Sequence, residues 1–368
     1  MNKKVILIGL TPQGLSLLRV MSRAGLNVTA FTMTKSVAGY YSRYGERILF
    51  KNIDDLKFQI EGILKTINCK PVCYIASGEL LALILSEYSE LYDACQVISG
   101  TYQTVKKLAH KDIMYGIALS KGLNVAKFYT LDKYIEGSLN YPLYIKRNYE
   151  IPLFFKAACV RTKDELNVYL DKITDKSIYE HIILQEHYGI STNELIEISC
   201  QAYFVNGQPK GFLITDQKRR LNQGLTSFIE EITDKELLKK VIDLTTNFMA
   251  GIDYTGFSEF EFAYNKVTHE FFFIEVNTRT CGLQSSLNYK FKNLKEVFLN
   301  PFNPPELEST SGPVIWMNIL RDIKVRFQKR YFKRFIRDLY RAQFDILDFY
   351  DIKPFFAPLL KTFVKRQK

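Results

Sequence analysis

Apolar positions near the start of the chain follow first a strand pattern and then a helical one. Residues 3–9 form a short apolar run with β-branched side chains, and residues 28–31 form another. Between these runs, apolar residues recur at helical spacing after Pro12 and stop before Gly25. This order predicts a βαβ unit, the opening of a parallel α/β domain, and a further buried strand at 71–76 extends it.

A second pattern, at residues 256–279, alternates aromatic and acidic side chains. It predicts two strands, at 257–264 and 270–276, and the short polar turn between them favours an antiparallel hairpin. Glu259 and Glu261 are two residues apart, so they share one face of the first strand. Carboxylates are therefore expected on one face of this hairpin.

The end of this hairpin carries a candidate metal site. If the two strands are in register, the side chains of Glu261, Glu275 and Asn277 converge. Three oxygen ligands without a nearby Cys or His suit Mg²⁺. Arg279 follows two residues later, where its planar guanidinium could hold a phosphate or an acyl phosphate. The alternative is that these carboxylates form the solvated face of an ordinary two-layer sheet.

Composition argues against several other kinds of site. The chain has 368 residues, enough for two or three domains, and its content of 47% apolar and 24% charged residues is that of an ordinary soluble protein. Its six cysteines include no Cys-x-x-Cys pair, and its four histidines form no cluster. Disulfide frameworks and zinc sites are therefore not expected.

The net charge of +11 is concentrated towards the C-terminus. Residues 313–368 hold 14 Lys and Arg against 5 Asp, and apolar residues recur at helical spacing from Arg321 to Phe344. A basic amphipathic helix is typical of contact with a membrane surface or an acidic partner, and packing against the main domain is the alternative. Because no apolar run could cross a bilayer, we expect a cytoplasmic protein, peripheral to the inner face of the membrane through this helix. No nucleic acid partner is expected, because a single helix carries the excess of positive charge.

The hairpin ending resembles the ATP-grasp superfamily, whose metal-binding strands carry an acidic residue and then Glu-x-Asn-x-Arg. The matching residues here are Glu261, Glu275, Asn277 and Arg279. The resemblance covers roughly residues 1–300 and implies an α/β fold, with α+β character in its ATP-grasp part. The implied ranges are a Rossmann-like parallel-sheet domain at 1–107, the small and large ATP-grasp subdomains at 108–180 and 181–300, and a linker with a basic helical tail at 301–368.

The resemblance also implies which residues bind the nucleotide. A Tyr-Pro-x-x-x-Lys strand would bring Lys146 to the α-phosphate, where an anion offsets the desolvation of the lysine. The full implied set is Lys111, Lys146, Lys156, Gln185, Glu186, Tyr188 and Glu194. The family's glycine-rich loop is missing, because residues 147–155 contain no glycine. Arg147 and Asn148 are candidates to replace its backbone amides with side chains.

Three implied catalytic residues lie on the acceptor and phosphate side. They are Arg279, Lys218 and Arg220, the last two by similarity to the D-aspartate ligase group, with Thr226 beside them. The alternative for Lys218 and Arg220 is a solvated bend.

The resemblance implies an ATP-dependent carboxylate–amine ligase that uses Mg²⁺, with Mn²⁺ as a second candidate ion. ATP would phosphorylate a carboxylate, and an amine would displace phosphate to form an amide. The enzyme would join an amino acid to a peptide, a sugar acid or an envelope polymer precursor. Two alternatives stay open: an enzyme of the carbamoyl-phosphate type, and a non-catalytic nucleotide-binding protein, which the glycine-free loop favours.

Overall fold

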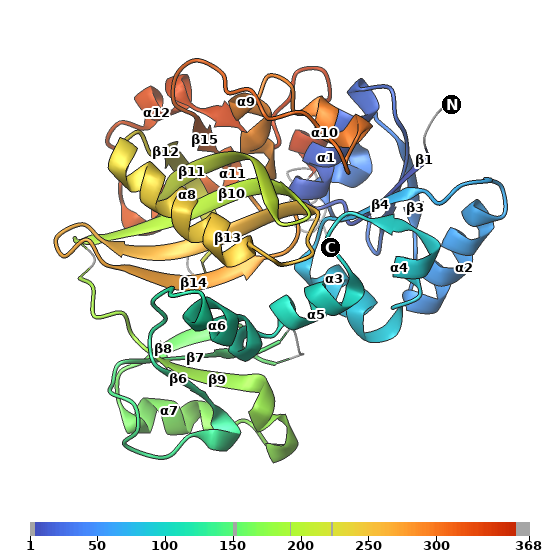
Figure 1. The fold of residues 1–368 in the computed structure, drawn as a ribbon. Helices are drawn as coiled ribbons and strands as arrows, with labels where there is room; N and C mark the ends of the chain where they lie inside the picture. The colour runs from blue at the N-terminus through green and yellow to red at the C-terminus, as the bar shows by residue number, and fades with distance from the viewer. Residues whose placement is uncertain (1–3, 150–152, 192, 222–223, 358–368) are drawn as a thin grey trace, which may run out of the picture. The chain divides into compact units, whose positions relative to one another are not determined.

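The computed structural model describes residues 4–149, 153–191, 193–221 and 224–357 (Figure 1). The chain divides into two units. Unit 1 comprises Met1–Val105, Cys200–Glu259 and Asn277–Lys368, and unit 2 comprises Lys106–Ser199 and Phe260–Val276. The domain ranges derived from the sequence remain predictions.

Unit 1 opens with a five-stranded parallel sheet in the order β3-β2-β1-β4-β5. Its strands are β1 (Lys4–Ile8), β2 (Asn27–Thr32), β3 (Glu46–Leu49), β4 (Val72–Ile75) and β5 (Gln96–Val97). The connecting helices are α1 (Pro12–Arg23), η1 (Ala38–Tyr41), α2 (Ile53–Leu64), α3 (Gly78–Glu87) and α4 (Leu91–Ala94). The predicted βαβ opening is confirmed by β1, α1 and β2.

The loop after β1 lies directly against the first turn of α1. Gly9 has φ +105°, and a Cβ added at Gly14 would come within 2.0 Å of the Gly9 carbonyl oxygen. Only glycine fits this approach, so these two residues allow the loop and the helix to pack closely. The next loop carries a helix cap, because Ser77 Oγ accepts a hydrogen bond from the Leu80 amide at 3.4 Å.

A distant part of the chain completes this first layer. The buried guanidinium of Arg19, on α1, donates from Nε to Asp351 Oδ2 at 3.0 Å. The same carboxylate accepts from Ser42 Oγ at 2.7 Å and from the Arg43 amide at 2.8 Å. Asp351 therefore fixes α1 to the segment after η1.

The second sheet has seven strands in the order β14-β13-β10-β11-β12-β15-β16. They are β10 (Leu195–Val205), β11 (Gln208–Arg220), β12 (Thr226–Glu231), β13 (Gly256–Asn265), β14 (Phe271–Asn277), β15 (Ile315–Met317) and β16 (Gln343–Phe344). The associated helices are α8 (Lys235–Met249), η4 (Gln284–Ser286), α9 (Leu287–Lys290) and α10 (Lys295–Leu299). The predicted hairpin is confirmed, since β13 and β14 are neighbours joined by a short turn.

Unit 2 contains a four-stranded antiparallel sheet in the order β6-β9-β7-β8. Its strands are β6 (Phe128–Thr130), β7 (Leu143–Arg147), β8 (Ala157–Val160) and β9 (Ile182–Glu186). The helical segments are α6 (Lys111–Ser120), η2 (Leu131–Lys133), α7 (Lys163–Leu170) and η3 (Lys176–His181), and α5 (Tyr102–Ala109) connects the units along the chain. Apolar residues of β7, β9 and α7 form the core of this unit.

The single basic helix predicted at 321–344 is wrong. The structure has two helices, α11 (Ile319–Lys329) and α12 (Phe335–Arg341), and the chain between them passes through left-handed backbone at Arg330 (φ +50°) and Arg334 (φ +66°). Charged side chains are among the buried ones in this segment. Asp322 and Arg326 are buried, whereas the aromatic residues Phe327, Tyr331, Phe332 and Tyr340 are exposed.

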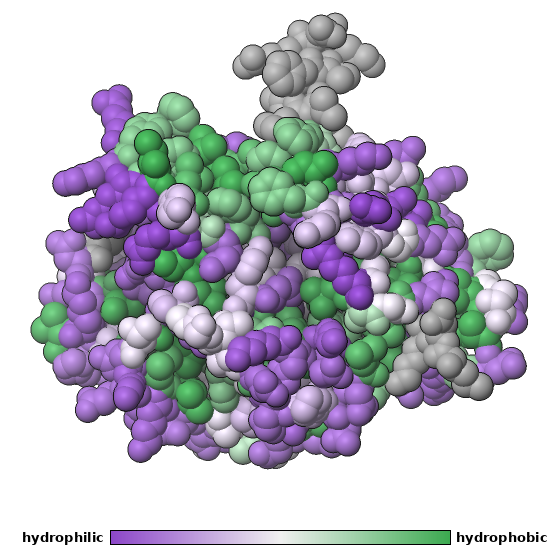
Figure 2. All heavy atoms as spheres, turned by 90° about the horizontal axis from the view of Figure 1, so that it is seen from above, coloured by the Kyte–Doolittle hydropathy of each residue, from purple (hydrophilic) through white to green (hydrophobic). Residues whose placement is uncertain are grey.

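One face of the molecule has a mixed character. Figure 2, which views the molecule from above Figure 1, shows hydrophobic side chains gathered beside strongly hydrophilic ones. Among the residues that the structure describes, no helix is long and apolar enough to cross a membrane.

Candidate functional site

The best-defined candidate site lies in unit 2, around a lysine on the central strand β7. Lys146 pairs with Ala157 of β8 on one side and with Ile183 of β9 on the other. Its side chain is buried, with 8% of its surface exposed. A buried ammonium group is costly unless polar groups or anions face it.

Two polar side chains face the Lys146 ammonium. Its Nζ lies 2.7 Å from the Tyr115 hydroxyl, on α6, and 2.5 Å from Gln185 Oε1, on β9. Gln185 in turn donates from Nε2 to the Ala126 carbonyl at 3.0 Å. These contacts fix the lysine head but supply no negative charge. Burial, followed by repulsion from Lys111, lowers the pKa of Lys146 to about 7, and attraction to Glu275 opposes this.

Lys111 and Glu275 form an ion pair beside this lysine. Lys111 Nζ, at the start of α6, lies 2.5 Å from Glu275 Oε2, on β14. Both side chains are about one quarter exposed, at 25% and 27%. Asn148 positions α6, because its carbonyl accepts from the Lys111 amide and its Oδ1 from the Asp112 amide, both at 3.0 Å. The suggestion that Arg147 and Asn148 replace the missing glycine loop stays a prediction.

The predicted adenine and ribose residues lie at the end of β9 and just beyond it. Glu186 accepts hydrogen bonds from the amide and side chain of Asn140, at 2.9 and 3.1 Å. The Tyr188 ring contacts the Phe272 ring, with centroids 5.5 Å apart. The Glu194 carbonyl accepts from the Lys266 amide at 3.0 Å, which fixes the backbone there. The binding roles of these residues stay predictions.

The charges of Glu261 and Glu275 both affect the pKa of Tyr188. Burial raises the pKa of the Tyr188 hydroxyl, and the charges of Tyr144, Glu275 and Glu261 raise it further. Both carboxylates therefore lie close enough to Tyr188 to affect its hydroxyl. Their role as Mg²⁺ ligands stays a prediction. The described residues contain no group of three His, Cys, Asp or Glu side chains that could hold a metal ion. The predicted third ligand, Asn277, is not one of these four residue types.

That asparagine and the predicted catalytic arginine belong to unit 1. Asn277 Nδ2 donates to Glu259 Oε2 at 3.3 Å, and Arg279 donates to Asn277 Oδ1 at 3.2 Å. The Arg279 guanidinium also passes over Gly78, where an added Cβ would come within 2.9 Å of it. Hydrogen bonds thus connect Glu259, Asn277 and Arg279 in sequence.

The remaining predicted residues are more exposed. Lys156, just before β8, is exposed. Lys218, on β11, is exposed and paired with Asp216. Arg220 donates from Nε and Nη2 to Gln217 Oε1, at 3.0 and 2.8 Å. Residues 150–152 of the glycine-free loop lie outside the described residues.

Sequence reasoning missed Tyr115, which contacts the candidate phosphate lysine. Tyr115 is fully buried on α6, and in the sequence it was one of the apolar positions of that helix. A tyrosine at a helical core position is a weak signal, because such rings usually only pack.

The likeness to known proteins lies in the structure and not in the sequence. No family model matches the chain, and no curated protein matches it significantly. A solved N5-carboxyaminoimidazole synthetase from Staphylococcus aureus, complexed with ADP, has a TM-score of 0.70 at 14% identity, over 90% of this chain and 87% of that one.

Two further solved structures have the same fold. The L-amino acid ligase from Bacillus licheniformis has a TM-score of 0.63 at 16% identity, over 83% of this chain and 75% of that one. The biotin carboxylase domain of the Hydrogenobacter thermophilus 2-oxoglutarate carboxylase, in complex with MgADP and bicarbonate, has a TM-score of 0.67 at 13% identity. The match covers 86% of this chain and 74% of that one. The predicted fold class, an α/β chain with an ATP-grasp fold, is confirmed.

Proposed function

We propose that the chain is an ATP- and Mg²⁺-dependent carboxylate–amine ligase that forms an amide through an acyl phosphate. The observation that carries this proposal is the buried Lys146, whose only close polar partners among the described residues are neutral oxygens. An ammonium group held this way is suited to an anion that arrives with the substrate. Since ADP and MgADP occupy solved structures of this fold, a nucleotide phosphate is the natural anion.

The proposed mechanism is electrostatic. Lys146 holds a phosphate oxygen, and Lys111 leaves Glu275 to bind the phosphates. Glu261, Glu275 and Asn277 would hold Mg²⁺, which, when bound, supplies positive charge against the transferring phosphoryl group. Arg279 stabilises the acyl phosphate with its guanidinium. A carboxylate oxygen attacks the γ-phosphorus of ATP, and ADP leaves. The amine nitrogen then attacks the acyl carbon, inorganic phosphate leaves, and the amine proton passes to phosphate or solvent.

The substrates are proposed to be an amino acid and a second small carboxylate or amine, because a solved structure of this fold is an L-amino acid ligase. A screen of amino acids and sugar acids for stimulated ADP release tests this. Amide formation with ADP release supports the ligase. Carbamoyl phosphate formation from bicarbonate would support the carbamoyl-phosphate-type alternative, and nucleotide binding without turnover would support the non-catalytic one.

Glu275→Ala is expected to lower the rate of ATP turnover by about a hundredfold or more, because it removes both a proposed metal ligand and the partner of Lys111. The measurement is ADP release at saturating ATP. Glu270→Ala is the matched control, since it removes an exposed carboxylate from the turn of the same hairpin and should keep full turnover. Turnover that survives in Glu275→Ala contradicts the proposed metal site.

Peripheral contact of a cytoplasmic protein with the inner face of the membrane, through the C-terminal basic segment, is a further part of the proposal. Its support is the exposure of apolar side chains among the cations of α12, with Ile336 82% exposed. Ile336→Ser is expected to weaken sedimentation with vesicles that contain phosphatidylglycerol by a few fold. Phe58→Ser, which removes a 75% exposed ring on α2, should leave it unchanged. Equal loss in both variants would contradict a specific contact.

A further inference from the structure

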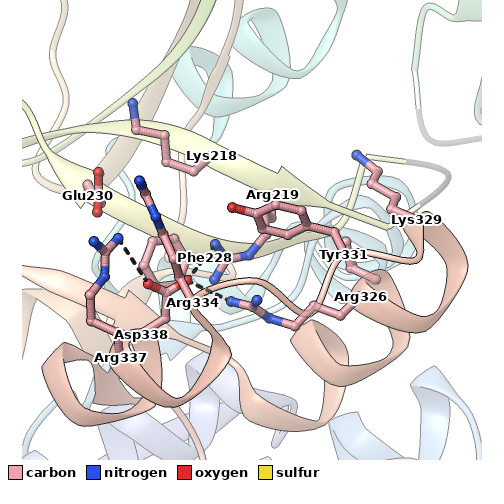
Figure 3. Close-up of a pocket in the computed structure, with 11 residues that line it drawn as sticks. Lys218, Arg219, Phe228, Glu230, Arg326, Lys329, Tyr331, Arg334, Arg337 and Asp338 are labelled. Carbon is pink, nitrogen blue, oxygen red and sulfur yellow. Dashed lines mark hydrogen bonds and ion pairs between the residues drawn. The ribbon is translucent and has the colours of Figure 1, made fainter.

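A cavity of about 350 Å³ lies in unit 1 between the strands β11 and β12 and the helices α11 and α12 (Figure 3). Six of the side chains that line it are cationic: Lys218, Arg219, Arg326, Lys329, Arg334 and Arg337. The volume is that of a small-molecule site. None of its residues belongs to the predicted nucleotide or metal set, and Lys218 is the one predicted catalytic residue among them. We call it the α11–α12 pocket.

Two of the arginines form the floor of the pocket and are neutralised there. Arg326, which is 0% exposed, lies 2.6 Å from Asp322 and 2.7 Å from Asp338. Arg219 reaches the same two carboxylates, at 2.7 and 3.0 Å, and its guanidinium covers the Phe228 ring at 3.7 Å. This buried network fixes the floor and does not attract a ligand by itself.

The charge above this floor is not balanced. Lys218 pairs with Asp216, and Arg337 approaches Asp338 only to 3.7 Å. Within the described parts of the chain, the side chains of Lys329 and Arg334 have no carboxylate partner. Six cations line the pocket, and the four carboxylates that line it or pair with them leave an excess of two positive charges.

The backbone directs Arg334 into this space. Arg334 has φ +66°, which is uncommon for a residue with a side chain, and Arg330 has φ +50°. Figure 3 shows the head groups of Lys218, Arg334 and Arg337 at one end of the pocket, together with Glu230, while Lys329 lies at the other end near Tyr331. Such backbone is kept where the surroundings require it, often beside a ligand site.

We propose that the α11–α12 pocket binds a phosphate monoester. At neutral pH a phosphate monoester carries about −1.5 to −2 charges, which matches the excess of two, and its three oxygens accept several charge-assisted hydrogen bonds. Arg334 and Arg337 hold the phosphate group, and Lys329 and the Tyr331 ring face the organic part. The site does not depend on the proposed ligase reaction.

The test compares two variants of the same loop. Lys329→Gln/Arg334→Gln removes one Lys and one Arg that line the pocket. Arg330→Gln/Lys333→Gln removes one Arg and one Lys from exposed positions that do not line it. The net charge changes equally, so general electrostatic attraction falls by the same amount in both. Binding of glycerol 3-phosphate is measured by calorimetry, and binding of phosphatidylcholine vesicles containing phosphatidic acid by sedimentation.

The pocket variant is expected to weaken binding by about tenfold to a hundredfold, because it loses the charge-assisted contact of Arg334 with the phosphate and the excess of two positive charges in the pocket. The control is expected to change binding by less than about twofold. This result with glycerol 3-phosphate assigns a soluble ligand. The same pattern with vesicles alone assigns a lipid headgroup. Equal weakening by both variants, or no binding of either probe by the unmodified protein, overturns the proposal. Arg337→Gln is a second variant with the same expectation as the pocket pair.

Discussion

The affinity of the protein for ADP, measured without a divalent ion, is expected to fall as the pH rises above about 7, the pKa of Lys146. Lys146 is cationic below its pKa and neutral above it, and burial is the main cause of the low pKa. A bound phosphate favours the cation and therefore raises this pKa. Affinity is then highest below pH 7 and decreases by up to about tenfold per pH unit above it.

Lys146→Met should remove this pH dependence. At pH 6 the variant loses a charge-assisted hydrogen bond to phosphate, so its affinity for ADP is expected to be about tenfold to a hundredfold lower. Calorimetric titrations from pH 6 to pH 8 measure both effects. Lys133→Met, which changes an exposed lysine of η2, is the matched control and should behave like the unmodified protein. A pH-independent affinity in the unmodified protein would show that Lys146 does not bind the phosphate.

The second large effect concerns stability, and Asp322 is its source. Its carboxylate is 0% exposed and accepts from Arg219 Nε at 2.7 Å, Arg326 Nε at 2.6 Å and Ser227 Oγ at 3.0 Å. Asp322→Ala leaves the buried Arg326 with Asp338 as its remaining carboxylate partner. The free energy of unfolding is expected to fall by about 3–5 kcal/mol. Chemical denaturation measures this loss.

Two further variants separate charge from packing. Asp243→Ala, at an exposed position of α8, should change the free energy of unfolding by less than about 0.5 kcal/mol. Adding Arg326→Met to Asp322→Ala removes the uncompensated cation, so the double variant should recover part of the loss. The Arg326→Met single variant is measured as well. If the double variant loses as much free energy of unfolding as the two single variants together, the two charges are not coupled, and this account of the network is wrong.

The sequence predicted the elements whose side chains repeat with a clear period. The β13–β14 hairpin followed from alternating aromatic and acidic residues. Lys146 was identified from the resemblance of its strand to the Tyr-Pro-x-x-x-Lys pattern. The contact of Lys146 with Tyr115 and Gln185 could not be predicted. It depends on how α6 and β9 pack against β7, and sequence spacing does not encode distances between separate elements.

The C-terminal segment was predicted less well, for a different physical reason. Its apolar residues recur at helical spacing, which normally indicates a buried face. Yet the buried residues of α11 and α12 are Asp322, Arg326 and Asp338, with Val325 as the one apolar residue among them. Their burial depends on mutual pairing with Arg219, which is more than 100 residues away along the chain. Breaks at arginines in left-handed backbone also carry no sequence signal, since glycine or asparagine usually occupies such positions.

The contact between Arg19 and Asp351 has a consequence for biosynthesis. The two residues are 332 positions apart. At 5–20 residues per second, a ribosome needs roughly 20 to 60 seconds to make the chain between them. During that interval the guanidinium on α1 lacks its carboxylate, so this layer reaches its final stability only after Asp351 has been made. A chaperone that shields newly made chains would have this layer in reach during that time.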